Sequence, residues 1–238
     1  IYLCKKFNLI FMKKAFFSIA LAALTVASCS RDNDDSTPAQ NQEQTNPNLK
    51  TVADLDVSNA SKWVYFSFSK GTAVNVADPD NSSDWDIAFK EYNVRTKNGA
   101  LKTENKDMSS VKEAPTSGYT ADKSRLTFVG RGIAEVVSSP VIYTGFSTAF
   151  WNKMEQFNLF KDLTEAKKTE LKNNLINDNG WQTFSYPPSF TQNNWVYIVK
   201  TADGKAAKIQ LTSYNHSTKN TTGFITFKYQ VANSNNKF

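Results

Sequence analysis

Few residues in this chain have side chains that could carry out acid–base, nucleophilic or metal chemistry. The only histidine, His216, lies in the polar loop NHSTKN, a position that argues against both a Ser-His-Asp triad and a histidine-rich metal site. Both cysteines, Cys4 and Cys29, lie near the N-terminus. The carboxylates that could pair for glycoside chemistry surround a predicted turn, where solvated acids are expected; they are Asp78, Asp80, Asp84 and Asp86. The sequence therefore predicts a binding protein and not an enzyme.

The elements that would position a binding residue are mostly strands. Runs rich in β-branched and aromatic residues recur between turn residues; they cover residues 63–69, 85–89, 125–130, 141–146, 195–200, 206–214 and 223–231. The clearest hairpin joins the fifth and sixth runs through an Asp-Gly turn at 203–204. In the last run, alternation puts Ile225, Phe227, Tyr229 and Val231 on one face. Residues 51–238 are therefore expected to form a single, mainly β, antiparallel domain.

Two segments break the strand pattern and predict short helices before the final strands. Residues 164–180 begin with Thr164 as a possible N-cap, carry an acid in the first turn, and reach Gly180 as a stop signal. Upstream, three apolar residues recur at i, i+4 and i+7, as in a helix that faces a core; they are Phe150, Met154 and Phe157. One or two short inserted helices are thus expected in the β domain.

The N-terminus has the features of a secretory signal. Residues 12–28 contain a Met, two lysines, an apolar run too short to span a bilayer comfortably, and a small residue before Cys29. A cysteine at the cleavage point is typical of bacterial lipoproteins, in which it carries the lipid. Residues 1–28 are interpreted as a signal peptide, with 1–11 as translation upstream of the natural start, and Cys29 as the lipidation site. An ordinary signal peptide with an incidental cysteine is the alternative.

The segment after the lipidation site is strongly polar. Residues 29–50 contain almost no apolar side chain, so they cannot bury enough surface to offset their ordering entropy, and a disordered tether is predicted. Its acids Asp32, Asp34 and Asp35 resemble an export signal that sends some lipoproteins to the outer face of the outer membrane. The expected location is therefore the outer membrane, lipid-anchored and exposed at the cell surface. A plain solvated linker is the alternative.

The charge of the mature chain argues against nucleic acid as a partner. Residues 1–28 contain four of the 28 basic residues and no acid, so the rest of the chain carries 24 Lys and Arg against 22 Asp and Glu. The remaining formal charge, about +2, gives little attraction to a phosphate backbone.

Several stretches of the β domain resemble the HmuY family of surface lipoproteins, which bind haem. The resemblance is carried by their order along the chain: SDWDIAF (83–89), VRTKNGA (94–100), SGYTAD (117–122), YPPSFTQNNWVYIVKTADGKAAKIQLTSY (186–214) and GFITFKYQ (223–230). It implies a mostly β fold with a haem cleft between two loop-bearing edges. It also implies that captured haem is delivered to a TonB-dependent haem transporter of the outer membrane.

The same resemblance indicates where axial ligands to haem iron would lie. In the family these ligands are paired His or paired Met, one after the SGYTAD-like stretch and the other just before the Pro-Pro turn. Neither residue type occupies those segments here, which makes Tyr186 and Tyr143 the ligand candidates at these places. Met154 could serve as a thioether ligand. Met108, in a polar segment where exposed Met is common, and His216, in a solvated loop, are less suited.

Aromatic side chains near these candidates could line the cleft. Trp181 and Phe184 are expected to form apolar walls between residues 137–146 and 181–188. A β core would use the same aromatic residues equally well, and Met154 also fits a helical core stripe. Two other functions fit this reading of the sequence. One is a carbohydrate-binding surface lipoprotein, in which exposed aromatic rings stack on sugar faces, and the other is a partner-binding lipoprotein that has lost haem ligation.

Overall fold

The computed structural model describes residues 47–176, 179–186, 189–219 and 221–238. The expected signal peptide, Cys29 and most of the expected tether lie outside the described residues. In chain order the elements are β1 (Lys50–Asp56), β2 (Val64–Ser67), β3 (Thr72–Val74), β4 (Ile87–Lys90), β5 (Asn93–Thr96), β6 (Ala100–Lys102), the 3₁₀ turn η1 (Met108–Ser110), β7 (Lys123–Val129), β8 (Gly132–Ser138), β9 (Thr144–Phe146), α1 (Thr148–Gln156), α2 (Glu165–Leu175), β10 (Gln182–Ser185), β11 (Ser189–Gln192), β12 (Tyr197–Lys200), β13 (Ala206–Asn215) and β14 (Thr222–Val231).

The largest sheet has five antiparallel strands in the order β1-β14-β13-β12-β6. The predicted hairpin is confirmed: β12 and β13 pair antiparallel, and Gly204 in the connecting turn has φ +83°. The predicted apolar face of β14 is also confirmed, because Ile225, Phe227 and Tyr229 are all buried. The alternation in the sequence therefore gives both the register and the buried face of this sheet.

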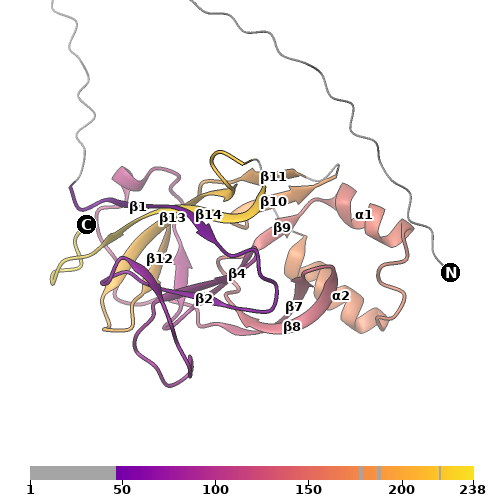
Figure 1. Cartoon of the computed structure of the whole chain (residues 1–238), viewed down its shortest axis with the longest axis horizontal. Coiled ribbons are helices and arrows are strands. Elements are labelled where there is room, and N and C mark those ends of the chain that lie inside the picture. The colour runs from indigo at the N-terminus through magenta and orange to yellow at the C-terminus, as the bar shows by residue number, and fades with distance from the viewer. Residues whose placement is uncertain (1–46, 177–178, 187–188, 220) are drawn as a thin grey trace, which may run out of the picture. The chain divides into compact units, whose positions relative to one another are not determined.

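A four-stranded sheet in the order β3-β2-β4-β5 packs against the first and encloses the main core (Figure 1). Phe66 on β2 and Phe89 on β4 lie 5.2 and 5.6 Å from Phe227 on β14, measured between ring centroids. Aromatic pairs at such distances add to the stabilisation from apolar burial alone. The core is therefore built from rings that the two sheets contribute from opposite sides.

Strand β4 is buried on both faces, whereas its alternating sequence predicts a half-buried strand. Ala88 is fully buried, and Asp86, expected to be a solvated acid, is only 5 % exposed. The carboxylate of Asp86 accepts the backbone N–H groups of Phe68 and Ala202, each at 2.7 Å. Asp86 is buried because Phe68 and the β12–β13 turn, which is distant in sequence, approach its carboxylate, and the two N–H donors replace water around the acid.

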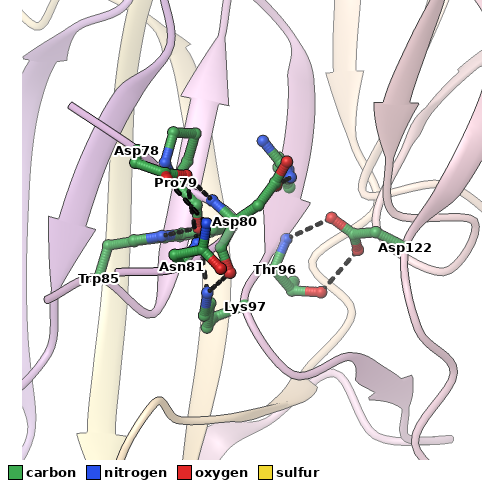
Figure 2. Close-up of polar contacts among 9 residues, drawn as sticks. Asp78, Pro79, Asp80, Asn81, Trp85, Thr96, Lys97 and Asp122 are labelled. Carbon is green, nitrogen blue, oxygen red and sulfur yellow. Dashed lines mark hydrogen bonds and ion pairs between the residues drawn. The ribbon is translucent and has the colours of Figure 1, made fainter. Parts of the chain in front are cut away.

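The conspicuous Trp-Asp motif before β4 has a structural role. The Trp85 indole N–H donates to the carbonyl of Pro79 at 2.9 Å, and Lys97 Nζ donates to the carbonyls of Pro79 and Asp80 (Figure 2). After β5, the predicted turn is confirmed by Gly99, whose φ is +91°. These bonds tie the 78–85 loop to the end of β5.

Both helices lie at one end of the β domain, next to the β7–β8 hairpin and a small sheet in the order β11-β10-β9 (Figure 1). Ser147 caps α1, and Thr164 caps α2 as predicted, its hydroxyl accepting the N–H of Lys167 at 3.3 Å. Helices, hairpin and small sheet share a second core of buried side chains: Leu126, Phe128, Phe146, Phe150, Trp151, Phe160, Leu171 and Leu175.

Two details of the helix predictions are wrong. α1 ends at Gln156, so Phe157 does not join the core stripe and is 59 % exposed. α2 ends at Leu175, well before Gly180, which has a different role. A Cβ at Gly180 would lie 2.4 Å from the Tyr143 carbonyl oxygen, so glycine is needed there because the chain passes very close to the residue before β9.

The predicted fold is confirmed: the described residues form a mainly β domain with two short inserted helices, although β9 and β10 pair in parallel. β1 begins at Lys50, within the last residues of the expected tether, and pairs with β14. Among the described residues, no helix has the length and apolar character needed to cross a membrane.

Candidate ligand-binding site

The contact between α1 and β10 brings two predicted ligand residues, Met154 and Tyr186, into one region. The helix starts where β9 ends, because the Ser147 hydroxyl accepts the N–H of Phe150 at 3.1 Å. The Ser147 N–H donates to the carbonyl of Phe184 at 2.9 Å, which holds the start of α1 against β10. Tyr186 directly follows β10, and Met154 occupies the second half of α1.

The outer surface of this region carries two exposed aromatic rings with a cation between them. Phe157 is 59 % exposed and Tyr186 is 49 % exposed. The Nζ of Lys153 lies 5.1 Å from the ring centroid of Phe157 and 5.7 Å from that of Tyr186. We call Lys153, Met154, Phe157 and Tyr186 the α1–β10 patch. Large apolar groups gathered on a surface in this way are typical of a binding site.

Closely packed aromatic side chains support the patch from below. Phe184, one of the predicted wall residues, is half-buried and lies 4.4 Å from Phe150 and 4.6 Å from Phe190, measured between ring centroids. Phe190 in turn lies 4.8 Å from Tyr214 on β13. Met154 packs partly against the same second core. A series of packed aromatic rings therefore runs beside the patch, from α1 to β13 of the five-stranded sheet.

The third predicted ligand residue, Tyr143, lies elsewhere. The backbone N–H of Trp181, the residue before β10, donates to the Tyr143 carbonyl at 2.9 Å, so Tyr143 lies beside the start of β10. Tyr186 lies directly after the other end of β10. Five residues of extended chain span about 16 Å. Tyr143 and Tyr186 therefore lie at opposite ends of β10, and Tyr143 is not part of the α1–β10 patch.

The cleft expected between residues 137–146 and 181–188 does not form where these segments pair. Residues 144–146 and 182–184 are directly bonded neighbours in a parallel ladder. Trp181, the other predicted wall residue, is fully buried in the main core, and its indole N–H donates to the Tyr92 carbonyl at 3.4 Å. Its ring is therefore already used for packing. Trp151 is buried as well and stacks on Phe160 at 4.4 Å.

Met108 and His216, the two weaker ligand candidates, both lie outside the α1–β10 patch. Met108, expected to be exposed, is 6 % exposed and belongs to a third core cluster. It is buried because η1 packs on β13, where Lys208 Nζ donates to the Met108 carbonyl at 2.8 Å. His216 lies in the β13–β14 connection, where its Nδ1 accepts the N–H of Thr218 at 3.2 Å and its ring meets Phe224 edge-on.

Lys153 is not among the residues predicted from the sequence, and the predicted place of Phe157 is in the core. Their i, i+4 spacing places Lys153 and Phe157 next to each other. Helical spacing also puts Phe157 near the face of the buried Phe150, so only the end of α1 at Gln156 shows that Phe157 is exposed. Among the described residues, no group of three or more His, Cys, Asp or Glu side chains is placed to hold a metal ion. The chemistry that the patch offers is an apolar surface, a phenol oxygen, a thioether and one ammonium group.

Comparisons with known proteins place this arrangement in a family. A crystal structure of a candidate HmuY-like haem-binding protein from Bacteroides vulgatus has 22 % identity and a TM-score of 0.49, covering 77 % of this chain and 91 % of that one. A candidate lipoprotein from Bacteroides fragilis has 20 % identity and a TM-score of 0.49, covering 77 % and 89 %. Apo PinO from Porphyromonas gingivitis has 17 % identity and a TM-score of 0.50, covering 77 % and 96 %, and its likeness shows a shared fold.

A search of curated proteins found no match. The family model described as HmuY protein matches residues 59–229, a span that runs from before β2 into β14 and includes both helices and the α1–β10 patch. Because this match covers well over half of the sequence, the chain belongs to the HmuY family.

Proposed function

We propose that this protein binds haem and that the α1–β10 patch is the binding surface. Membership of the HmuY family supports haem as the ligand, as does the description of the Bacteroides vulgatus structure as haem-binding. The observation that carries the placement is the exposure of Phe157 and Tyr186 on either side of Lys153. The proposed activity is binding, without catalysis.

The chemistry of the patch fits the requirements of haem. The macrocycle needs a flat apolar surface, and covering exposed aromatic area contributes about 25 cal/mol per Å². Phe157 and Tyr186 offer such area, and Phe184 and Phe150 pack against each other on the neighbouring parts of β10 and α1. The ammonium group of Lys153 is placed to pair with a propionate at the edge of the ring system.

The phenol oxygen of Tyr186 is the proposed axial ligand. Bound haem would supply a ferric iron, a Lewis acid that a phenolate oxygen holds by charge. Tyr186 is accessible, directly follows β10 and lies beside Lys153. The thioether of Met154 is the second ligand candidate, on the adjoining turn of α1. Tyr143 lies outside the patch and is not proposed as a partner of Tyr186.

The cellular role we propose is capture of haem for an outer-membrane transporter. The inferred lipid on Cys29 and the polar residues 29–50 would tether the domain to the outer membrane and leave the patch free. An exposed binding surface suits transfer, because a ligand held at a surface is released without unfolding of the core. The partner is then a TonB-dependent haem transporter, as the family resemblance implies.

Haemin titration of the full chain tests this proposal. A Soret band that saturates at one haem per chain is expected in the parent. Tyr186→Phe keeps the aromatic surface but removes the phenol oxygen, so we expect the dissociation constant to rise at least about tenfold. Tyr143→Phe is the matched control and should bind like the parent. The proposal fails if Tyr186→Phe and Lys153→Ala both bind haem as tightly as the parent.

The exposed rings of Phe157 and Tyr186 would also suit stacking on sugar faces. A glycan array with the same full chain separates the two functions. Sugar binding that disappears in Phe157→Ala, together with the absence of a saturable Soret band, would replace haem by carbohydrate as the ligand of the patch.

A further inference from the structure

A hollow separate from the α1–β10 patch lies between the start of β7 and the last turn of α2. It has a volume of about 200 Å³, and it is lined by Lys123, Arg125, Pro140, Tyr143, Asn173 and Asn174. Two of these side chains are cationic, two are amides, and none is a carboxylate. Because one water occupies about 30 Å³ in the liquid, the hollow has room for a small polyatomic ion with part of its hydration shell.

Arg125 is the unusual member of this lining because it is a charged residue with only 5 % of its surface exposed. Its Nη1 and Nη2 atoms donate to the carbonyls of Ser139 and Asn174, each at 2.9 Å. A guanidinium group has five N–H donors, so these two bonds use only part of its capacity. The buried Nε atom has no hydrogen-bond partner among the described residues.

The charge of Arg125 is also incompletely balanced. None of the ion pairs among the described residues includes Arg125. Its nearest acid in the sequence, Asp122, accepts both the N–H and the hydroxyl of Thr96, at 2.8 and 2.7 Å. A buried cation without a bonded counter-charge is costly, and such groups are normally paired. The ring of Tyr143, whose centroid lies 5.1 Å from the guanidinium, makes a cation–π contact with it but is not a carboxylate counter-charge.

We infer that this hollow is a binding site for a small oxyanion, of the carboxylate or phosphate class. Lys123 at the rim would attract the anion, and the remaining N–H donors of Arg125 would bind its oxygens at the base. The side-chain amides of Asn173 and Asn174 would provide further donors. The residues involved come from β7 and α2, so anion binding would also strengthen the contact between the hairpin and the helix.

This site is distinct from the proposed haem surface. Tyr143 belongs to its lining and is level with Trp181, at the opposite end of β10 from Tyr186. A haem group, with its extended apolar macrocycle, does not suit a small hollow lined mostly by polar side chains. Anion binding in this hollow can therefore be tested independently of haem binding.

A purely structural role for Arg125 is the competing explanation. Its two carbonyl bonds join β7 to the 139 loop and to the C-terminal turn of α2, where a cation also balances the helix dipole. A variant of Arg125 alone could therefore disturb the fold. Lys123, by contrast, is exposed and has no role in the buried packing. It allows the site to be tested without changing the core.

The test is a titration of the full chain with sodium phosphate and, separately, sodium succinate, followed by calorimetry at constant ionic strength set with sodium chloride. Saturable one-site binding of at least one anion is expected. Lys123→Ala should raise its dissociation constant at least about fivefold, the effect of losing one charge-assisted contact. Lys167→Ala, which removes the same charge from an exposed position on α2, should bind like the parent.

Comparison of the two anions shows which class the site prefers: tighter binding of phosphate indicates a phosphate ligand, and tighter binding of succinate indicates a carboxylate ligand. Arg125→Lys keeps the charge but removes the guanidinium fork, so it should weaken binding further while near-ultraviolet circular dichroism reports whether the fold is intact. If Arg125→Lys is unfolded, the Lys123→Ala result decides. If neither anion shows saturable binding at concentrations up to about 10 mM, any dissociation constant lies above the low millimolar range, and the inference is overturned. Equal binding by the parent and Lys123→Ala also overturns it. Haemin binding should be unchanged in Lys123→Ala.

Discussion

Trp181 donates its backbone N–H to the carbonyl of Tyr143 across 2.9 Å, and this bond sets the register of the parallel pair β9 and β10. It places the two candidate tyrosine ligands at opposite ends of β10, with Tyr186 in the exposed patch and Tyr143 beside Arg125. The parallel register of β9 and β10 thus separates two tyrosines that look equivalent in the sequence.

The oxidation state of the iron should decide whether Tyr186 or Met154 is the ligand. A phenolate holds ferric haem by charge and loses its advantage on reduction, whereas a thioether favours the ferrous state. We expect haem bound to the full chain to be released on addition of dithionite, as followed by the Soret band. Tyr186→Phe should abolish this redox dependence, and Met154→Leu should leave it intact. Tighter binding after reduction would assign the iron to Met154 instead.

Gly180→Ala should destabilise the fold by about 1–3 kcal/mol, the usual cost of forcing extra atoms into a packed region. The added Cβ would lie 2.4 Å from the Tyr143 carbonyl oxygen and 2.8 Å from the Gly145 nitrogen, both in the backbone. Gly132→Ala is the matched control, since its Cβ would meet nothing closer than 3.9 Å. Urea unfolding of both variants measures the difference. Equal free energies of unfolding would show that β9 and β10 can separate at no cost.

Asp86→Ala should lower the free energy of unfolding by about 2–5 kcal/mol, because two buried N–H donors would lose their acceptor. Those donors belong to Phe68 and Ala202, which follow β2 and β12, strands of different sheets. Asp84→Ala provides the comparison: its carboxylate pairs with Lys70 at 2.9 Å on the surface, and we expect a loss below about 1 kcal/mol. Chemical denaturation at neutral pH distinguishes them, and similar losses would contradict the structural role of Asp86.

The stability of the fold should fall as the pH rises from about 4 to about 6. Burial raises the pKa of Asp122 from 3.8 to about 6, although hydrogen bonds from Thr96 oppose the shift (Figure 2). Between these values the folded chain binds more protons than the unfolded chain, so raising the pH favours unfolding.

The pH effect can be isolated with Asp122→Asn, which cannot titrate. The free energy of unfolding of this variant should change less between pH 4.5 and 6.5 than that of the parent, as measured by urea unfolding. Acids whose pKa is lowered in the fold, such as Asp56 and Asp203, stabilise the folded chain above pH 3.8. Their contribution is lost only as the pH falls below that value, outside this window. An unchanged pH slope in Asp122→Asn would show that another group is responsible.

Cys29→Ala should release the protein from the membrane fraction of a bacterial host, because the thiol that would carry the lipid is removed. Labelling with a radioactive fatty acid should mark the parent and Cys4→Ala but not Cys29→Ala. Retention of Cys29→Ala in the membrane fraction at the parent's level would refute the lipoprotein interpretation.

Local sequence patterns predicted both helices and seven of the fourteen strands among the described residues, and missed mostly short strands such as β3, β6 and β10. The alternation in β14, the Asp-Gly turn after β12 and the Thr164 cap of α2 depend on neighbouring residues only, and the structure confirms all three. The order of several stretches was also enough to indicate the HmuY family, which the family model then matched over residues 59–229.

The tertiary structure alone decided which side chains are accessible. Asp86 and Met108 are buried by segments about 100 residues or more away along the chain, and Phe157 is exposed because α1 ends one residue earlier. The separation of Tyr143 from Tyr186 likewise depends on the parallel register of β9 and β10. Local periodicity carries no information about such long-range contacts, since burial and register are properties of the partner segment as much as of the residue itself.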